Sequence, residues 1–311
     1  MSSAPIISAF PFDVRPGEVD ANLKQVLQAI ERAQGVGAGL LALPEKWPTS
    51  FLPSYDAALL NATERALQVV QAAAQRAELT VVGSAPCWTM EGDGKETLLV
   101  GEDSGNQKKP FNQIHFLGAG GDRRPYSKRV LFSPTGEGWQ VARGTGLPQT
   151  LATPVGQVCA LVCYDLRFPE LTRHAFYQGA DLLVVPAQWP HPRTGIFELL
   201  SQARAAENQS WLLACNRAGR AALEGRPNPQ TDSSSQTPNP QAAAAKRPPR
   251  VMDFPGTAMA VNPFGDVAKR SDDGDFLVAE IDLALMAEVR KKVPCARDLK
   301  QAGLWPQSDS D

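Results

Sequence analysis

The sequence of 311 residues is poor in cysteine and histidine, and this scarcity excludes several kinds of protein. It contains five cysteines, widely spaced and without a Cys-x-x-Cys pair, and three histidines. An odd number of scattered cysteines is not a disulfide framework, and so few histidines form no Cys/His cluster typical of a metal site. We therefore expect reduced thiols and no bound metal.

An excess of one charge and long apolar runs are also missing. Lys and Arg together number 31 against 33 Asp and Glu, and no basic stripe is present. Nucleic acid and anionic membrane are therefore poor candidate partners. No apolar run approaches the roughly 18 residues of a membrane-spanning helix. Residues 1–10 lack the basic and apolar regions of a secretory signal. These features predict a cytoplasmic protein.

The regular feature of the chain is an alternation of short apolar runs with segments of helical periodicity. Near-continuous apolar strands between helices are typical of an α/β protein whose sheet is covered by helices. The length is ample for one large core. Strands are expected at 6–10, 40–44, 79–83, 157–163, 181–187 and 210–215. Helices are expected at 19–34, 62–77, 169–178, 195–209 and 283–292.

Two stretches depart from this alternation. The middle of the chain predicts antiparallel strands at 97–101, 112–117 and 124–128, because turns rich in Gly and Asp separate them. Residues 223–250 are rich in Pro, Ser, Gln and Asn and hold few large apolar residues, which predicts a disordered surface loop. An inert insertion is the favoured interpretation of that loop over a partner-binding segment. We expect a single domain over residues 1–311 that this loop interrupts.

Glu45, Lys128 and Cys163 each stand at the end of an expected strand, where loop-borne active sites form. Taken singly, each has an ordinary structural explanation. Glu45 could hydrogen-bond a turn, Lys128 could lie on a solvated face and Cys163 could be a small core residue. The three together, each with its particular neighbours in sequence, indicate a catalytic base, a cation and a nucleophile.

The neighbours of these three residues resemble the signature segments of the nitrilase, or carbon–nitrogen hydrolase, superfamily. The segments occur in the order found in that family, and the likeness covers nearly the whole chain outside residues 223–250. The three signature segments are Leu43-Pro44-Glu45, Tyr126-Ser-Lys128-Arg-Val-Leu-Phe132 and Cys163-Tyr-Asp-Leu-Arg167-Phe-Pro-Glu170-Leu. Further similarity lies in residues 179–187, 202–208, 256–265 and 281–283.

This resemblance implies an α-β-β-α sandwich, a catalytic trio of Glu45, Lys128 and Cys163, and no metal or organic cofactor. It also implies that Glu137 supports Lys128 and that the chain forms homo-oligomers. One position departs from the family pattern, because members often carry a histidine where this chain has Val130. That histidine lies outside the trio, so the departure concerns local packing.

The trio predicts hydrolysis of a small-molecule amide through a thioester. Cys163 attacks, Glu45 moves the proton, and Lys128 with the backbone N–H of Tyr164 stabilises the oxyanion. Arg167 either binds a substrate carboxylate or forms an ion pair with Glu170 or Asp165. An aromatic-walled pocket is expected from side chains that could equally be packing residues. These are Trp47, Phe51, Tyr55 and Trp189.

The segment that begins at Cys163 resembles the omega-amidase and deaminated-glutathione amidase branches. The favoured prediction is an omega-amidase that acts on a small dicarboxylic monoamide such as 2-oxoglutaramate and releases ammonia. A deaminated-glutathione amidase or another amidase of the family is the alternative, and a true nitrilase is less favoured. Two readings compete from outside the family: a hydrolase that pairs Cys163 with a histidine, and a non-catalytic scaffold that binds partners through residues 223–250.

Overall fold

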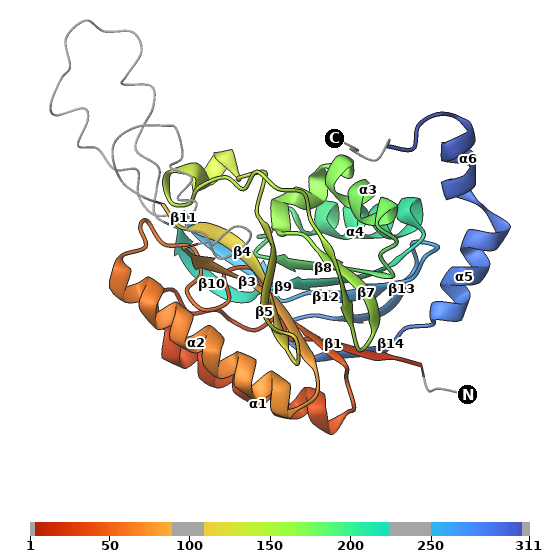
Figure 1. Ribbon diagram of the computed structural model, residues 1–311. Coiled ribbons are helices and arrows are strands. Elements are labelled where there is room, and N and C mark those ends of the chain that lie inside the picture. Colours follow the sequence, from red (N-terminus) through yellow and green to blue (C-terminus); the bar gives the residue numbers. More distant parts are fainter. Residues whose placement is uncertain (1–3, 89–108, 224–249, 307–311) are drawn as a thin grey trace, which may run out of the picture.

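The computed structural model describes residues 4–88, 109–223 and 250–306. Two six-stranded sheets pack against each other, and helices cover their outer faces (Figure 1). The first sheet has the order β14-β1-β2-β3-β4-β5 and the second has the order β13-β12-β9-β8-β7-β6. This is the predicted α-β-β-α sandwich in one domain.

The first sheet combines strands from both ends of the chain. Its strands are β1 (Ile6–Ala9), β2 (Leu40–Ala42), β3 (Thr80–Cys87), β4 (Phe111–Gly118), β5 (Gly121–Ser127) and β14 (Leu277–Glu280). The three strands β1, β2 and β3 run parallel, whereas β4, β5 and β14 pair antiparallel with their neighbours. The antiparallel character predicted for the middle of the chain is therefore correct for β4 and β5. The strand expected at 97–101 lies outside the described residues.

The second sheet has a similar plan, with a parallel centre and antiparallel edges. Its strands are β6 (Thr150–Thr153), β7 (Gly156–Ala160), β8 (Leu182–Ala187), β9 (Trp211–Asn216), β12 (Ala258–Val261) and β13 (Val267–Ser271). The strands β7, β8 and β9 are parallel. A separate hairpin pairs β10 (Ala218–Leu223) with β11 (Arg250–Pro255). Most of the loop expected at 223–250 lies outside the described residues, and its two end residues pair with each other in this hairpin.

Burial of apolar side chains explains the layers. Side chains of both sheets form one buried cluster between them, with Leu40 and Val82 from the first sheet and Val184 and Leu213 from the second. A second cluster joins the outer face of the first sheet to α1 (Val19–Gly35) and α2 (Ala57–Arg76). On the second sheet lie α3 (Pro169–Tyr177) and α4 (Thr194–Asn208), and the chain continues into α5 (Leu283–Lys292) and α6 (Cys295–Gln301).

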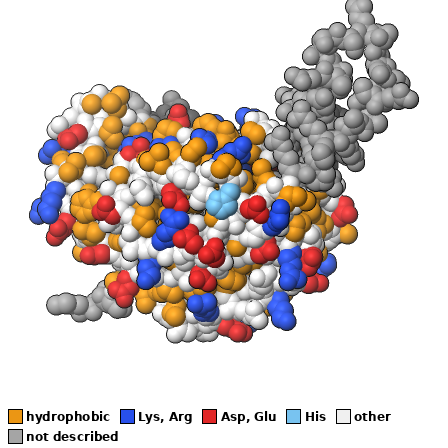
Figure 2. Space-filling model, turned by 180° about the vertical axis from the view of Figure 1, so that it is seen from behind, with side chains coloured by type: hydrophobic (Ala, Val, Ile, Leu, Met, Phe, Trp, Pro, Cys, Tyr) orange, Lys and Arg blue, Asp and Glu red, His pale blue; other side chains and the backbone are white. Residues whose placement is uncertain are grey.

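Most expected helices and strands are present with shifted ends. The helix expected at 62–77 begins earlier, because Asp56 caps it and its side chain accepts a hydrogen bond from the Leu59 N–H at 2.8 Å. The strand expected at 157–163 ends at Ala160, and Cys163 begins the 3₁₀ turn η3 (Cys163–Arg167). No helix in the described residues is long and apolar enough to cross a membrane. Acidic and basic side chains are interspersed on the face shown in Figure 2.

Close packing beneath the loop after β2 leads to a first prediction. A Cβ atom added at Gly83 in β3 would lie 2.9 Å from Trp47 Cδ1 and 3.1 Å from Leu43 Cβ. We expect Gly83→Ala to lower the free energy of unfolding by about 1–3 kcal/mol through overpacking. Urea unfolding measures the change. Gly35→Ala is the matched control, because its Cβ would meet nothing within 4 Å. Equal stabilities of the two variants would contradict the prediction.

Candidate active site

Four segments bring polar side chains to one end of the paired sheets. Glu45 follows β2, Lys128 follows β5, Cys163 follows β7 and Gln188 follows β8 directly. The strands β2, β7 and β8 belong to the parallel centres of their sheets. Ligand sites in such sheets form beyond the carboxyl ends of the strands. The predicted trio is therefore gathered by the topology of the two sheets.

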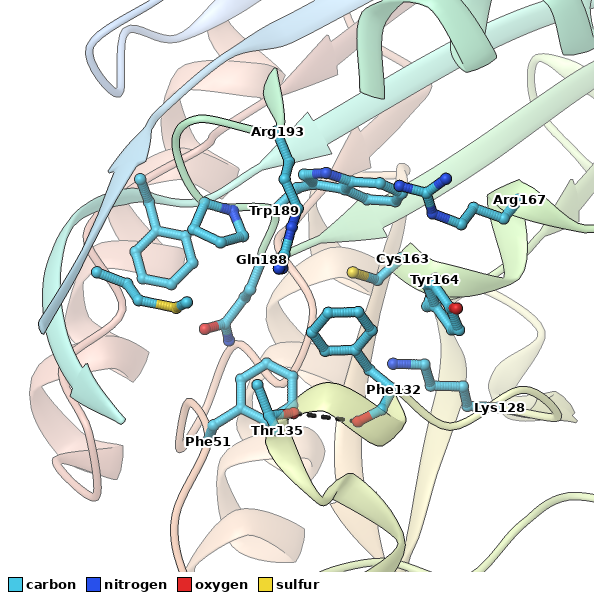
Figure 3. Close-up of a pocket in the computed structure, with 13 residues that line it drawn as sticks. Phe51, Lys128, Phe132, Thr135, Cys163, Tyr164, Arg167, Gln188, Trp189 and Arg193 are labelled. Carbon is cyan, nitrogen blue, oxygen red and sulfur yellow. Dashed lines mark hydrogen bonds between the residues drawn. The ribbon is translucent and has the colours of Figure 1, made fainter. Parts of the chain in front are cut away.

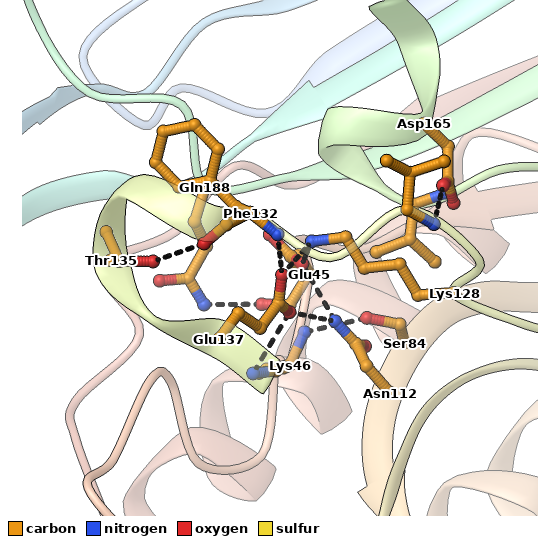
Figure 4. A network of polar contacts seen from close by, with 12 residues as sticks. Glu45, Lys46, Ser84, Asn112, Lys128, Phe132, Thr135, Glu137, Asp165 and Gln188 are labelled. Carbon is orange, nitrogen blue, oxygen red and sulfur yellow. Dashed lines mark hydrogen bonds and ion pairs between the residues drawn. The ribbon is translucent and has the colours of Figure 1, made fainter. Parts of the chain in front are cut away.

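Lys128 lies between two carboxylates in the protein interior (Figure 4). Its Nζ donates to Glu45 Oε1 at 2.8 Å and to Glu137 Oε2 at 2.7 Å. All three side chains have 0% exposure. A fourth buried charge, Lys46, has its Nζ 3.4 Å from Glu137 Oε1. Two cations and two anions thus occupy one buried cluster.

Neutral groups also donate hydrogen bonds to the two carboxylates and to the backbone of Glu45. The Asn112 side-chain amide donates to Glu45 Oε1 at 2.8 Å and to Glu137 Oε1 at 3.3 Å. The Phe132 N–H donates to Glu137 Oε2 at 2.8 Å. Gln188 Nε2 donates to the backbone carbonyl of Glu45 at 2.6 Å. These contacts fix the position of both carboxylates, because a buried charge is retained only when it is paired and hydrogen-bonded.

The charges of the cluster determine the protonation of its members. Burial alone would lower the pKa of Lys128, but the carboxylates of Glu137 and Glu45 outweigh burial and hold it well above its ordinary value. Burial would raise the pKa of Glu137, but Lys128 and then Lys46 outweigh it and the pKa falls. Lys128 is therefore a permanent cation and Glu137 a permanent carboxylate near neutral pH.

Cys163 begins the turn η3 in a left-handed conformation with φ 48°. This conformation is unfavourable for a residue other than glycine and is found at functional positions. Burial, and then the negative charge of Glu45, raise the pKa of the Cys163 thiol well above its usual value, while Lys128 opposes them. The thiol is therefore protonated at neutral pH, and its attack requires a base that removes the proton.

Glu45 is placed to be that base. Its Oε1 accepts from Lys128 and Asn112, whereas its Oε2 accepts no hydrogen bond from the described residues. The Cys163 side chain lies close enough to Glu45 for the two to interact. The free oxygen is thus available for the thiol proton.

Asp165 braces the turn that carries Cys163. Its Oδ1 accepts from the Val130 N–H at 2.9 Å, and its Oδ2 accepts from the Tyr126 hydroxyl at 2.9 Å. Burial raises the pKa of Asp165 to about 7, against the opposing charge of Lys128. Val130, which stands where relatives often carry a histidine, therefore contributes its backbone N–H to this bracing.

A cavity opens above Cys163 and Lys128, with aromatic walls and two guanidinium groups (Figure 3). Arg167 Cζ lies 5.3 Å from the Trp189 ring centroid, and Arg193 Cζ lies 5.3 Å from that of Phe132. Neither guanidinium has an acidic partner among the described residues, and no carboxylate lines the cavity there. Other lining residues are Phe51, Thr135, Tyr164, Gln188, Pro190, Met252 and Phe254.

Only some of the residues expected to form the substrate pocket line the cavity. Trp189, Phe51 and Arg167 line the cavity, but Tyr55 and Trp47 do not. Tyr55 packs with Leu60 and Val141, and its hydroxyl donates to the Ser50 carbonyl at 3.0 Å. The hydroxyl of Tyr55 therefore has a backbone partner, and the prediction that Tyr55 lines the cavity is wrong. The alternative ion pairs of Arg167 with Glu170 or Asp165 are not formed.

Tyr164 lines the cavity, and the three histidines lie elsewhere. The Tyr164 ring lies edge-on to Phe132, with 4.9 Å between ring centroids. Of the histidines, His115 is paired with Asp122 through Nδ1 at 2.9 Å, and none of the three lines the cavity. The geometry therefore favours Glu45 over a histidine as the partner of Cys163.

Several residues of the site were not recognised from the sequence. Asn112, Lys46 and Arg193 had no assigned role, although Lys46 is adjacent to Glu45. The position of Lys46 directly after the Leu43-Pro44-Glu45 segment was the signal that the sequence offered for its role. All five cysteines are free, and no group of three or more His, Cys, Asp or Glu side chains in the described chain could hold a metal.

Comparison with known proteins identifies the family. A sequence profile of the carbon-nitrogen hydrolase family matches residues 6–291. This chain belongs to the carbon–nitrogen hydrolase family. The prediction of a carbon–nitrogen hydrolase is therefore confirmed.

Individual relatives cover almost the full chain. A 2-oxoglutaramate amidase of Bacillus subtilis (strain 168) is 26% identical over 297 residues, 95% of this chain and 97% of that protein. An omega-amidase of Escherichia coli (strain K12) is 27% identical over 288 residues, 92% of this chain and 93% of that protein. These carbon–nitrogen hydrolases agree with the resemblance to the omega-amidase-like branch.

Solved structures share the fold. A CN-hydrolase superfamily protein from Xanthomonas campestris superposes with a TM-score of 0.70 at 21% identity, covering 96% of this chain and 97% of that chain. A carbon-nitrogen hydrolase from Helicobacter pylori G27 superposes with a TM-score of 0.74 at 20% identity, covering 95% of each chain. The sandwich seen here is thus the fold of other carbon–nitrogen hydrolases.

The buried cluster yields a stability prediction. Lys128→Met leaves Glu45 without a cation, so we expect the free energy of unfolding at pH 7 to fall by about 3–5 kcal/mol. Chemical denaturation measures this change. Lys24→Met, at an exposed position of α1, is the control and should change stability by no more than about 0.5 kcal/mol. A Lys128→Met variant as stable as this control would disprove the proposed charge pairing.

Proposed function

We propose that this carbon–nitrogen hydrolase is a cysteine-dependent omega-amidase that removes ammonia from a small dicarboxylic monoamide. The observation that carries the proposal is the Cys163 side chain near a carboxylate oxygen of Glu45 that accepts no hydrogen bond, in a cavity that also presents two guanidinium groups. The names of the relatives, omega-amidase and 2-oxoglutaramate amidase, support the amide as substrate. The monoamide 2-oxoglutaramate is the favoured substrate.

Acylation begins when the amide carbonyl carbon meets the thiol. The Cys163 sulfur forms a bond to that carbon while its proton passes to Glu45, and the carbonyl electron pair moves to oxygen. Lys128 and the Tyr164 N–H stabilise the resulting oxyanion. The tetrahedral intermediate then collapses, the carbon–nitrogen bond breaks, and Glu45 returns the proton to the departing ammonia.

Deacylation again passes a proton through Glu45, this time from water to the Cys163 sulfur. The thioester on Cys163 is attacked by water, which gives a proton to Glu45 as the oxygen–carbon bond forms. The sulfur leaves and regains that proton, so the free acid is released and the thiol is restored. Glu137 keeps Lys128 charged and positioned through both halves, since its carboxylate holds the Nζ at 2.7 Å.

The two guanidinium groups favour an anionic substrate. Arg167 and Arg193 line the cavity without a carboxylate partner among the described residues, so their charge is available to a ligand. A guanidinium binds a carboxylate by two parallel hydrogen bonds, which gives both affinity and orientation. A monoamide with a carboxylate at its other end therefore fits the cavity better than a neutral amide.

One experiment tests the substrate class. Ammonia release is measured from 2-oxoglutaramate and glutaramate, and from pentanamide, which has similar length but no carboxylate. We expect kcat/KM to favour glutaramate over pentanamide, and Arg193→Gln to reduce that preference by about tenfold or more through loss of a charged hydrogen bond.

Arg76→Gln, on the exposed end of α2, removes the same charge away from the cavity and should leave the preference unchanged. A wild-type enzyme that prefers pentanamide would overturn the proposed substrate class. A preference for deaminated glutathione over both monoamides would instead select the alternative branch.

A further inference from the structure

We propose that Lys46 is a positioning residue of the amidase, which supplies the second positive charge needed to keep the buried cluster neutral throughout the reaction. The proposal rests on the proposed function for its kinetic consequences, but not for its electrostatic basis. That basis is the contact of the Lys46 ammonium with Glu137 at 3.4 Å, with 0% exposure of both side chains (Figure 4).

The surroundings of Lys46 leave water little access to its charge. Its Nζ lies 4.0 Å from the Phe51 ring centroid and 5.4 Å from that of Tyr55. Phe51 lines the cavity, whereas Lys46 does not, so an aromatic ring separates the ammonium from the substrate. Lys46 is therefore placed to act through Glu137 and not by direct contact with the reacting atoms.

The local backbone directs Lys46 towards the cluster. Lys46 has φ 46°, and its N–H donates to Ser84 Oγ at 2.9 Å. A left-handed lysine costs free energy and persists only where the surroundings stabilise it. This conformation lets the neighbouring residues Glu45 and Lys46 both reach the cluster, although they are adjacent in sequence.

The charge count explains why a second lysine is useful. In the resting site, Glu45 and Glu137 are matched by Lys128 and Lys46. When Glu45 takes the thiol proton, its negative charge is replaced by that of the oxyanion, and the total stays zero. Without Lys46, the same buried cluster would carry one uncompensated negative charge at both stages. Such a charge is costly in a dry interior and more so beside a developing oxyanion.

Lys46 also influences the protonation of Glu137. Burial raises the pKa of Glu137, and Lys128 followed by Lys46 lowers it. The Tyr55 hydroxyl is a further ionisable group near the ammonium, and the charge of Lys46 opposes the rise that burial causes in the pKa of Tyr55. Removal of Lys46 therefore raises the pKa of Glu137 and leaves this buried carboxylate with Lys128 as its compensating charge, which Glu137 then shares with Glu45.

The kinetic test compares Lys46→Met with Tyr55→Phe. Lys46→Met removes the charge and keeps an unbranched apolar chain, and Tyr55→Phe removes a neighbouring hydroxyl without changing charge. For glutaramate hydrolysis, we expect Lys46→Met to lower kcat by about tenfold or more with KM changed less than about threefold. Tyr55→Phe should change kcat by less than about threefold, because it leaves the charges of the cluster unchanged. A Lys46→Met enzyme with the kcat of the wild type overturns the proposal.

A second test needs no substrate. Urea midpoints are measured at pH 7 for the wild type, Lys46→Met, Glu137→Gln and the double variant. Charge matching predicts that Lys46→Met lowers the midpoint less in the Glu137→Gln background than in the wild type, because the carboxylate is already absent. Equal shifts in both backgrounds would reduce Lys46 to a packing role and overturn the proposal. If the wild type hydrolyses no amide, the proposed function fails, and this cycle still decides the role of Lys46.

Discussion

The site depends on charges that are buried together away from the surface. An isolated buried ion is costly, so each charge of the cluster requires an opposite partner. Lys128 is shared by Glu45 and Glu137, and Asn112 bridges the same two carboxylates. This matching lets the protein keep a carboxylate beside a protonated thiol, which is the condition for the proton transfer that we propose at Cys163.

The packing of the two sheets brings the Glu45 carboxylate near the Cys163 thiol. Glu45 belongs to the first sheet, Cys163 to the second, and both follow parallel strands. The apolar cluster between the sheets fixes their separation, and Gln188 joins them by donating to the Glu45 carbonyl. A change in the packing of the sheets therefore changes the relation between base and nucleophile, even where it touches neither.

The sequence predicted the elements with alternating or helical periodicity, and the ends of their strands suggested the candidate trio, whose side chains lie near one another in the structure. It did not show by periodicity that the strands form two sheets face to face, which followed only from the family resemblance. The short strands β6, β12, β13 and β14 were not assigned as strands, whereas the equally short β1 and β2 were predicted because they lie in the longer apolar runs at 6–10 and 40–44.

The supporting residues were harder to predict because their roles depend on contacts distant in sequence. Lys46 is buried only because a left-handed turn aims it at Glu137. Arg193 has no acidic partner among the described residues, and this can be judged only once its neighbours in the fold are known. Tyr55 was expected in the pocket from its aromatic character, but the structure gives its hydroxyl a backbone partner elsewhere.

The central claim is that the Cys163 thiol, with Glu45 as its base, breaks the carbon–nitrogen bond. The direct measurement is ammonia release from glutaramate by Cys163→Ala beside Cys159→Ala, which changes a buried core cysteine. The account predicts that Cys163→Ala loses activity by at least roughly a thousandfold, as for removal of a catalytic nucleophile, while Cys159→Ala remains active. A folded Cys163→Ala enzyme with the turnover of the wild type would contradict it.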